Sequence, residues 1–271
     1  MVIAYIIGAI LVFSVYHLLS DGDFSFYLTL GGMTRTFGFA LLAFKIWKEK
    51  SAMGISLKTL QLYAIVFGAR LSSILFFEGY LPYDSSGDWF YQANEMLALG
   101  LVFLNIWLVS VKFRATYAEA LDAFGNLRVP PKFGALVYLA GPALLIAVIF
   151  HPNLNSFFLS DVAWTFALYL ESVAVVPQLY LFQRKGGEIE TFTAHYVFTF
   201  GLSRFFLFIF WVSSAHELND KTAQSIHGGW VGTVVLLMQV IHLVLMGDYS
   251  FYYIKSLKSG GPLVLPGINT V

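Results

Sequence analysis

The chain has 271 residues, of which 58% are hydrophobic and 12% are charged, and its formal net charge is zero. Soluble domains carry about 25% charged residues, so the excess of apolar surface must be covered by lipid. The neutral charge gives no indication of nucleic-acid binding. The absence of cysteine excludes disulfides, thiolate catalysis and cysteine-ligated metal sites.

Eight stretches are long and apolar enough to span, or nearly span, a bilayer, which takes about 20 residues per crossing. They are residues 3–19, 28–47, 58–77, 94–112, 132–150, 161–182, 192–213 and 229–253. The first can also be read as a signal peptide, but no basic residue precedes it and no convincing cleavage site follows it. We predict an all-α polytopic membrane protein that retains its first helix, with an interfacial or cleaved first segment as the alternative.

The loops between these stretches differ sharply in charge. The loops after the second, fourth, sixth and eighth stretches, with their edges, hold twelve basic residues, whereas the opposite loops hold one, Lys221. The twelve are Lys45, Lys48, Lys50, Lys58, Lys112, Arg114, Arg128, Lys132, Arg184, Lys185, Lys255 and Lys258. Because basic residues collect on the cytosolic side, the bias predicts a cytosolic C-terminus and, with eight crossings, a cytosolic N-terminus.

Charged residues also lie inside the apolar stretches, namely Arg35, Arg70, Arg204, Glu171 and Asp248. A charge in hydrocarbon costs roughly 2.5–3.5 kcal/mol, so such residues face a polar cavity, pair with one another or hold a ligand. A structural ion pair between helices would explain any one of them. The whole set favours a charged internal pocket.

Two predicted helices gather acidic, basic and aromatic residues on one face. Asp161, Trp164 and Glu171 fall within an arc of about 80° on a helix. Arg204 and Trp211 share a face of the next stretch. Arginine offers a planar fork for a carboxylate, and tryptophan offers a ring face for a cation. These residues predict a pocket for a small charged or zwitterionic ligand.

His242 lies in the middle of the last stretch, six residues before Asp248, and is a candidate pH-sensing group. The sequence has no His-x-x-x-His pair, phosphate loop or nucleophile elbow. We therefore predict a protein that is not an enzyme and that has no metal site or other cofactor.

Several longer motifs are specific enough to indicate a family. They are WTFALYLESVAVVPQL at Trp164–Leu179, ETFTAHY at Glu190–Tyr196, KIWK at Lys45–Lys48, KFRATY at Lys112–Tyr117 and DYSFYY at Asp248–Tyr253. Together they resemble the KDEL receptors, the ER lumen protein retaining receptors, from about residue 28 to the end.

The resemblance implies a seven-helix bundle similar to the SWEET and PQ-loop transporters. It also implies capture of escaped lumenal proteins by a C-terminal KDEL-like tetrapeptide, followed by retrieval from the Golgi to the endoplasmic reticulum. On this basis residues 1–27 are an extra N-terminal transmembrane segment, 28–257 the receptor-like seven-helix domain and 258–271 a cytosolic tail.

The resemblance assigns roles to the predicted pocket residues. Arg70 falls on the family arginine that meets the ligand's terminal carboxylate, Asp161 on a glutamate that meets the ligand's basic first residue, and Trp164 on that glutamate's neighbour. Further pocket or core positions of the family correspond to Glu171, Arg204, Trp211 and Asp248.

The departures from the family pattern concern the ligand's acidic residues. Leu28 and Ser214 stand where the family has two arginines that meet them, and Arg35 stands where it has a pH-sensing histidine. A charge-assisted hydrogen bond contributes roughly 1.5–3 kcal/mol. We therefore expect a KDEL peptide to bind weakly, unless Arg35 substitutes for the missing arginines.

Taken with the resemblance, the residues predict a membrane protein of the endoplasmic reticulum and Golgi that binds C-terminal retention signals, or related carboxylate ligands, with altered specificity. Its expected partners are signal peptides of lumenal proteins or another small carboxylate ligand, the lipid bilayer and vesicle coat proteins. The alternative is a SWEET- or PQ-loop-like transporter of a small solute, which a weak internal repeat around Arg70 and Arg204 favours. A third reading is a receptor relic that only assembles with other membrane proteins.

Overall fold

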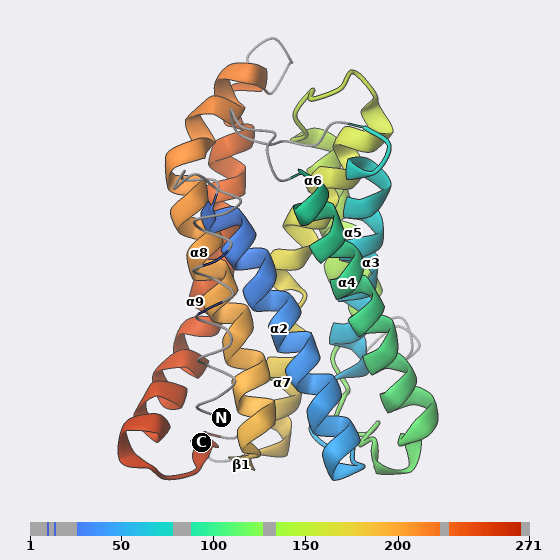
Figure 1. Cartoon of the computed structure of the whole chain (residues 1–271), viewed down its shortest axis with the longest axis vertical. Coiled ribbons are helices and arrows are strands. Elements are labelled where there is room, and N and C mark those ends of the chain that lie inside the picture. The colour runs from blue at the N-terminus through green and yellow to red at the C-terminus, as the bar shows by residue number, and fades with distance from the viewer. Residues whose placement is uncertain are drawn as a thin grey trace.

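The computed structural model describes residues 26–77, 88–126, 134–222 and 228–266, together with Ile10 and Ser14. Within these residues the protein is a bundle of helices that run up and down (Figure 1). The helices are α2 (Phe26–Glu49), α3 (Leu57–Ile74), α4 (Asp88–Trp107), α5 (Gly141–Ile149), α6 (Phe158–Val173), α7 (Val176–Lys185), α8 (Thr191–Thr222) and α9 (Val231–Ser259). Short helical turns flank them at Leu108–Lys112, Arg114–Thr116, Leu136–Ala140 and Gly228–Trp230.

Seven crossings of the described bundle match the predicted stretches from residue 28 onward, so the all-α polytopic fold is confirmed. Four of the helical segments are long and apolar enough to cross a membrane by themselves: Trp89–Lys112, Phe158–Lys185, Thr191–Asn219 and Val231–Ser259. The predicted first span, residues 3–19, lies outside the described residues apart from Ile10 and Ser14.

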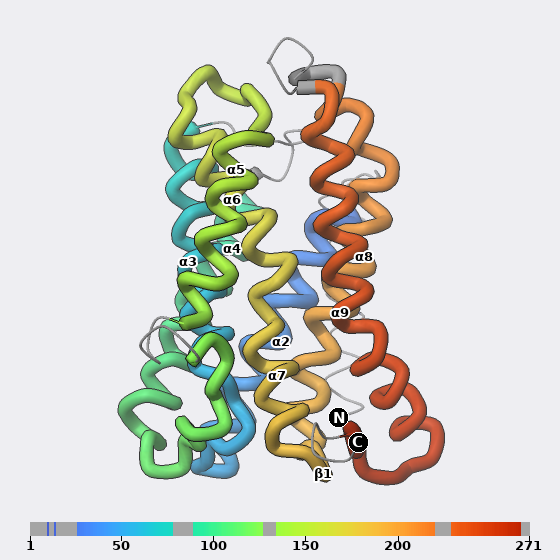
Figure 2. The backbone as a smooth tube through the Cα atoms, turned by 180° about the vertical axis from the view of Figure 1, so that it is seen from behind, coloured from blue at the N-terminus to red at the C-terminus, as the bar shows by residue number. Residues whose placement is uncertain are grey.

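The helices form two groups joined by α2. One group contains α3, α4, α5 and α6, and the other contains α8 and α9. Helix α2 packs against both α8 and α4, and it crosses the front of the molecule between the groups (Figure 1). Seen from behind, α6 and α7 run down the middle of the bundle (Figure 2). Residues on α2 and α6 can therefore face both groups.

Helix α2 lies very close to α8 because its facing positions are glycines. A Cβ atom at Gly38 would lie 2.1 Å from Thr199 Oγ1, and one at Gly31 would lie 2.8 Å from Leu207 Cγ. Ser203 Oγ also donates a hydrogen bond to the carbonyl oxygen of Gly31 at 2.7 Å. Small residues at helix interfaces in membranes permit this approach. The close packing positions the centre of α2 beside the centre of α8.

The fifth of the seven described crossings is broken where α6 ends and α7 begins. Pro177 lies in the first turn of α7, where its missing N–H group costs no helical hydrogen bond. Gln178 is fully buried; its Oε1 accepts from Ser56 N at 2.8 Å, and its Nε2 donates to Gly54 O at 2.7 Å. The hydrogen bonds of Gln178 therefore join α7 to the loop before α3. In that loop, Ser56 caps α3 by accepting from Thr59 N.

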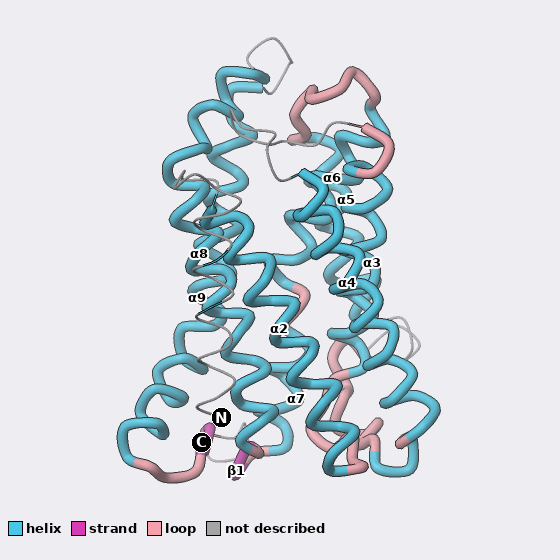
Figure 3. Tube along the Cα trace, viewed as in Figure 1, coloured by secondary structure: helices cyan, strands magenta, loops and turns pink. Residues whose placement is uncertain are grey.

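The chain after α9 folds back onto the loop between α7 and α8. Strand β2 (Leu263–Leu265) pairs antiparallel with β1 (Gly187–Ile189), with Ile189 opposite Leu263. The two strands lie at the end of the bundle where α7 and α9 finish and α8 begins (Figure 3). Leu263 and Leu265 are buried, so this part of the predicted tail is packed against the bundle.

Candidate ligand-binding site

Charged side chains from five helices meet in the middle of the bundle. They are Arg35 on α2, Arg70 on α3, Glu95 on α4, Glu171 on α6 and Arg204 on α8, and none is more than 4% exposed. We call these five residues the charged cluster. Because each comes from a different helix, the cluster links both groups of the bundle.

Four members of the charged cluster form a closed ring. Arg35 donates from Nη1 to Glu171 Oε1 and from Nη2 to Glu95 Oε1. Arg70 donates from Nη1 to Glu95 Oε2 at 3.1 Å and from Nη2 to Glu171 Oε2. Every terminal nitrogen of both guanidinium groups thus meets a carboxylate oxygen, and the ring has no net charge. Such paired, hydrogen-bonded geometry is what a buried charge requires.

Arg204 is attached to the ring at one point. Its Nη2 lies 2.9 Å from Glu171 Oε1, and its Nη1 donates to Gln239 Oε1 on α9 at 3.2 Å. With three arginines and two glutamates, the charged cluster has a net charge of +1. A buried excess of positive charge favours an incoming anion.

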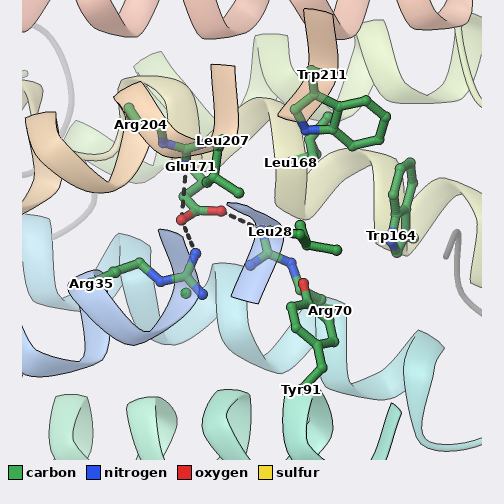
Figure 4. Close-up of a pocket in the computed structure, with 11 residues that line it drawn as sticks. Leu28, Arg35, Arg70, Tyr91, Trp164, Leu168, Glu171, Arg204, Leu207 and Trp211 are labelled. Carbon is green, nitrogen blue, oxygen red and sulfur yellow. Dashed lines mark hydrogen bonds and ion pairs between the residues drawn. The ribbon is translucent and has the colours of Figure 1, made fainter. Parts of the chain in front are cut away.

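A small cavity borders the charged cluster (Figure 4). Its volume is about 30 Å³, which is room for water but not for a peptide. It is lined by Leu28, Gly32, Arg35, Arg70, Tyr91, Trp164, Leu168, Glu171, Arg204, Leu207 and Trp211. The rings of Trp164 and Trp211 meet edge to face, with centroids 6.2 Å apart. The cavity therefore joins arginines to an aromatic wall, and a larger ligand requires the helices to move apart.

A layer of aromatic rings lies next to the charged cluster. Phe39 follows Arg35 by about one turn, and Phe200 precedes Arg204 by about one turn. Tyr63 stacks on Phe200 with centroids 4.9 Å apart and meets Phe39 edge to face at 5.1 Å. These rings lie toward the end of the bundle that holds β1 and β2, which the loop charges predict to be cytosolic.

The structure brings most of the predicted site residues together. Lining the cavity are Arg35, Arg70, Trp164, Glu171, Arg204 and Trp211. Asp161 is buried one turn before Trp164, and its Oδ1 accepts from Leu154 N at 3.2 Å. Asp248 is exposed on α9. Neither Asp161 nor Asp248 is among the described residues that line the cavity.

His242 is fully buried on α9 near the charged cluster. Its Nδ1 lies 2.7 Å from the carbonyl oxygen of Ser172, so Nδ1 carries the hydrogen and donates it. Asp248, expected as its acidic neighbour, is exposed elsewhere on the helix. The pH-sensing role of His242 stays a prediction.

Glu95 is the functional candidate that the sequence reasoning missed. It is fully buried, and it pairs with both Arg35 and Arg70. The sequence did indicate a charge inside the membrane at this position, because Glu95 is the second residue of the predicted span 94–112. Glu95 was not included among the charges inside the spans, whereas α4 begins at Asp88 and places Glu95 two turns inside the helix. No group of three or more metal-ligating side chains occurs among the described residues.

Three curated proteins illustrate what this chain is similar to. The ER lumen protein-retaining receptor of Dictyostelium discoideum is 30% identical over 241 residues, or 88% of this chain and 97% of that protein. The Drosophila melanogaster protein of the same name is 30% identical over 87% and 96% of the two chains. Human ER lumen protein-retaining receptor 2 is 29% identical over the same shares. All three are named as receptors rather than enzymes.

A family model agrees with these relatives. The model described as ER lumen protein retaining receptor matches residues 51–214, which include α3 to α7 and most of α8. The matched part contains four of the five residues of the charged cluster. The chain therefore belongs to the ER lumen protein-retaining receptor family, and it is a multi-pass membrane protein of the endoplasmic reticulum and Golgi.

Proposed function

We propose that the protein binds the C-terminal ends of lumenal proteins, or related small carboxylate ligands, and returns them from the Golgi to the endoplasmic reticulum. The names of its relatives support a receptor that retains lumenal proteins. The observation that carries the proposal for this chain is the net charge of +1 on the charged cluster beside a cavity. A ligand carboxylate matches both the charge and the fork geometry of the arginines.

Binding requires an exchange of partners. Arg70 already meets Glu95 and Glu171, so a ligand carboxylate must take over one of these contacts. Glu171 lines the cavity and is the carboxylate that a ligand meets first. The aromatic wall of Trp164 and Trp211 then offers ring faces to a basic or apolar part of the ligand.

The proposed specificity differs from that for an acidic tetrapeptide. Leu28 lines the cavity and has no donor for a carboxylate. Ser214 is buried on α8 and is not part of the described cavity lining. Two missing charge-assisted hydrogen bonds at roughly 1.5–3 kcal/mol each would weaken binding of a KDEL or HDEL tail by several orders of magnitude.

A peptide-binding assay tests this function. Purified protein is screened by ligand-induced thermal stabilisation against C-terminal tetrapeptides, with matched C-terminal amides as controls. We expect some free-carboxylate peptides to stabilise the protein, their amides to fail, and KDEL and HDEL to bind poorly. In cells that lack their own receptor, the protein should not retain KDEL-tagged cargo; full retention would contradict the altered specificity.

The alternative, transport of a small solute, needs a second opening toward the cytosol. The layer formed by Phe39, Tyr63 and Phe200 lies between the charged cluster and the predicted cytosolic end. A layer of packed rings at this position favours a receptor that opens only toward the lumen over a transporter with a path through the bundle. Uptake of labelled solutes into vesicles that contain the protein, without stabilisation by any peptide, would favour the transporter instead.

A further inference from the structure

Glu95 and Glu171 hold the same arginines from different sides. Glu171 lines the cavity, whereas Glu95 is not among the described residues that line it. Three arginines contact Glu171, and among the described residues two of them, Arg35 and Arg70, also pair with Glu95. Glu95 is therefore placed to keep its two arginines paired when Glu171 exchanges partners with a ligand.

Glu95 also determines the charge that a ligand encounters. With both glutamates ionised, the three arginines leave the charged cluster at +1. Without the charge of Glu95 the cluster would be at +2. Charge imbalance is costly where side chains are at most 4% exposed, because the interior screens charges poorly. The number of negative charges on the best ligand should follow the charge of the cluster.

We propose that Glu95 is a specificity-determining residue that selects ligands with a single carboxylate. One carboxylate neutralises the cluster, whereas further acidic side chains on the ligand would bring uncompensated negative charge into the same space. This inference rests on the proposed binding of carboxylate ligands and names the class of ligand. Besides the arginines missing at Leu28 and Ser214, it gives a second cause for the rejection of acidic tails, on α4 and outside the cavity lining.

A purely structural role is the competing explanation. Glu95 joins α2, α3 and α4 through Arg35 and Arg70, so its loss could simply loosen the bundle. Loosening would weaken all ligands alike. A change in cluster charge instead changes the preference between ligands of different charge, so the preference is the informative measurement.

The test compares Glu95→Gln, which keeps the shape of the side chain and removes its charge, with Glu119→Gln. Glu119 is exposed in the loop after α4 and provides the same charge change away from the site. Dissociation constants are measured for acetyl-KNQL, with one carboxylate, and acetyl-KDEL, with three. We expect wild type and Glu119→Gln to prefer acetyl-KNQL, and Glu95→Gln to shift the ratio at least about tenfold toward acetyl-KDEL.

An unchanged ratio in folded Glu95→Gln protein, or equal weakening of both peptides, would overturn the inference. If that variant does not fold, Arg35→Gln lowers the cluster charge to zero and should abolish the preference for free carboxylates over amides; an intact preference would be equally decisive. Melting temperatures with acetate and with succinate separate this inference from the proposed function. A shift from acetate toward succinate in Glu95→Gln supports the charge-setting role even if no peptide binds.

Discussion

At the scale of single residues, Arg70 shows how buried carboxylates orient a guanidinium group. Its two terminal nitrogens meet carboxylates from α4 and α6, so the guanidinium plane is fixed. A lysine has one nitrogen and cannot occupy both positions in the same way. The two contacts of Arg70 thus require two donors in a fixed geometry as well as a positive charge.

Substitution of Arg70 separates binding from folding. Arg70→Lys should express and fold nearly normally but bind carboxylate peptides roughly 10- to 100-fold more weakly, because one charge-assisted hydrogen bond is lost. Arg70→Ala should abolish binding and destabilise the protein, since Glu95 loses one of its two partners. Expression, melting temperature and peptide-induced stabilisation measure these effects. Normal stabilisation by peptide in well-folded Arg70→Ala protein would contradict the role of Arg70 in carboxylate binding.

The sequence predicted that charged residues meet inside the bundle, but it did not predict correctly all of the residues that do so. Arg35, Arg70, Glu171 and Arg204 were predicted from their positions inside apolar stretches, and the structure brings them together. Asp248 met the same criterion but lies exposed on α9. Position along a span does not show which face of a helix meets its neighbours, because that depends on packing between segments distant in sequence.

At the scale of elements, the apolar stretches predicted where helices cross but not where they end. Helix α8 continues nine residues past the predicted end at residue 213, to Thr222, and α4 begins six residues before residue 94. The added turns contain Glu217 on α8 and Gln92 on α4. Hydropathy marks the edge of the lipid, whereas backbone hydrogen bonds continue a helix beyond it.

The start of α8 is set by a capping residue outside the span. Glu190 accepts from Phe192 N at 2.7 Å, from Thr193 N at 2.8 Å and from Thr193 Oγ1 at 2.8 Å. Partial burial opposes ionisation, but these donors outweigh it and hold the pKa of Glu190 below its ordinary value of 4.5. The ionised cap therefore stabilises the folded state above that pH, and the stabilisation is lost as the pH falls through the lowered pKa.

Glu190→Gln should lower the melting temperature at neutral pH by an amount that corresponds to about 1 kcal/mol or less. The difference from wild type should shrink on acidification below pH 4.5, because wild-type Glu190 then becomes protonated. Glu188→Gln, at an exposed position of β1 in the same loop, serves as the matched control and should change little. A constant difference across the pH range would show that the charge of Glu190 is not what stabilises α8.

At the scale of the whole molecule, one end of the bundle collects the features predicted to be cytosolic. The pairing of β1 with β2 fixes the chain after α9 beside the start of α8. Lys112 follows α4, and its Nζ lies 3.4 Å from the centroid of the Trp47 ring near the end of α2. Basic and aromatic residues at one end fit the membrane surface on the side where basic residues collect.

Glycosylation mapping tests the predicted topology. An acceptor site added before residue 3 should stay unmodified, because eight crossings place the N-terminus in the cytosol with the C-terminus. An acceptor added between α3 and α4, in a loop with acidic residues, should be modified and serves as the positive control. Modification of the N-terminal acceptor in uncleaved protein would show that residues 3–19 do not add a crossing.

The charged cluster also has a consequence for biosynthesis, because its members leave the ribosome in the order Arg35, Arg70, Glu95, Glu171 and Arg204. The running charge of the inserted segments is then +1, +2, +1, 0 and finally +1. After α3 is made, two arginines have no acidic partner from the cluster, and each costs roughly 2.5–3.5 kcal/mol in hydrocarbon. Glu95 is the first acid to arrive, and the ring closes only once α6 has been synthesised. The early helices therefore need the insertion machinery, or water, around their arginines until more than half of the protein has been translated.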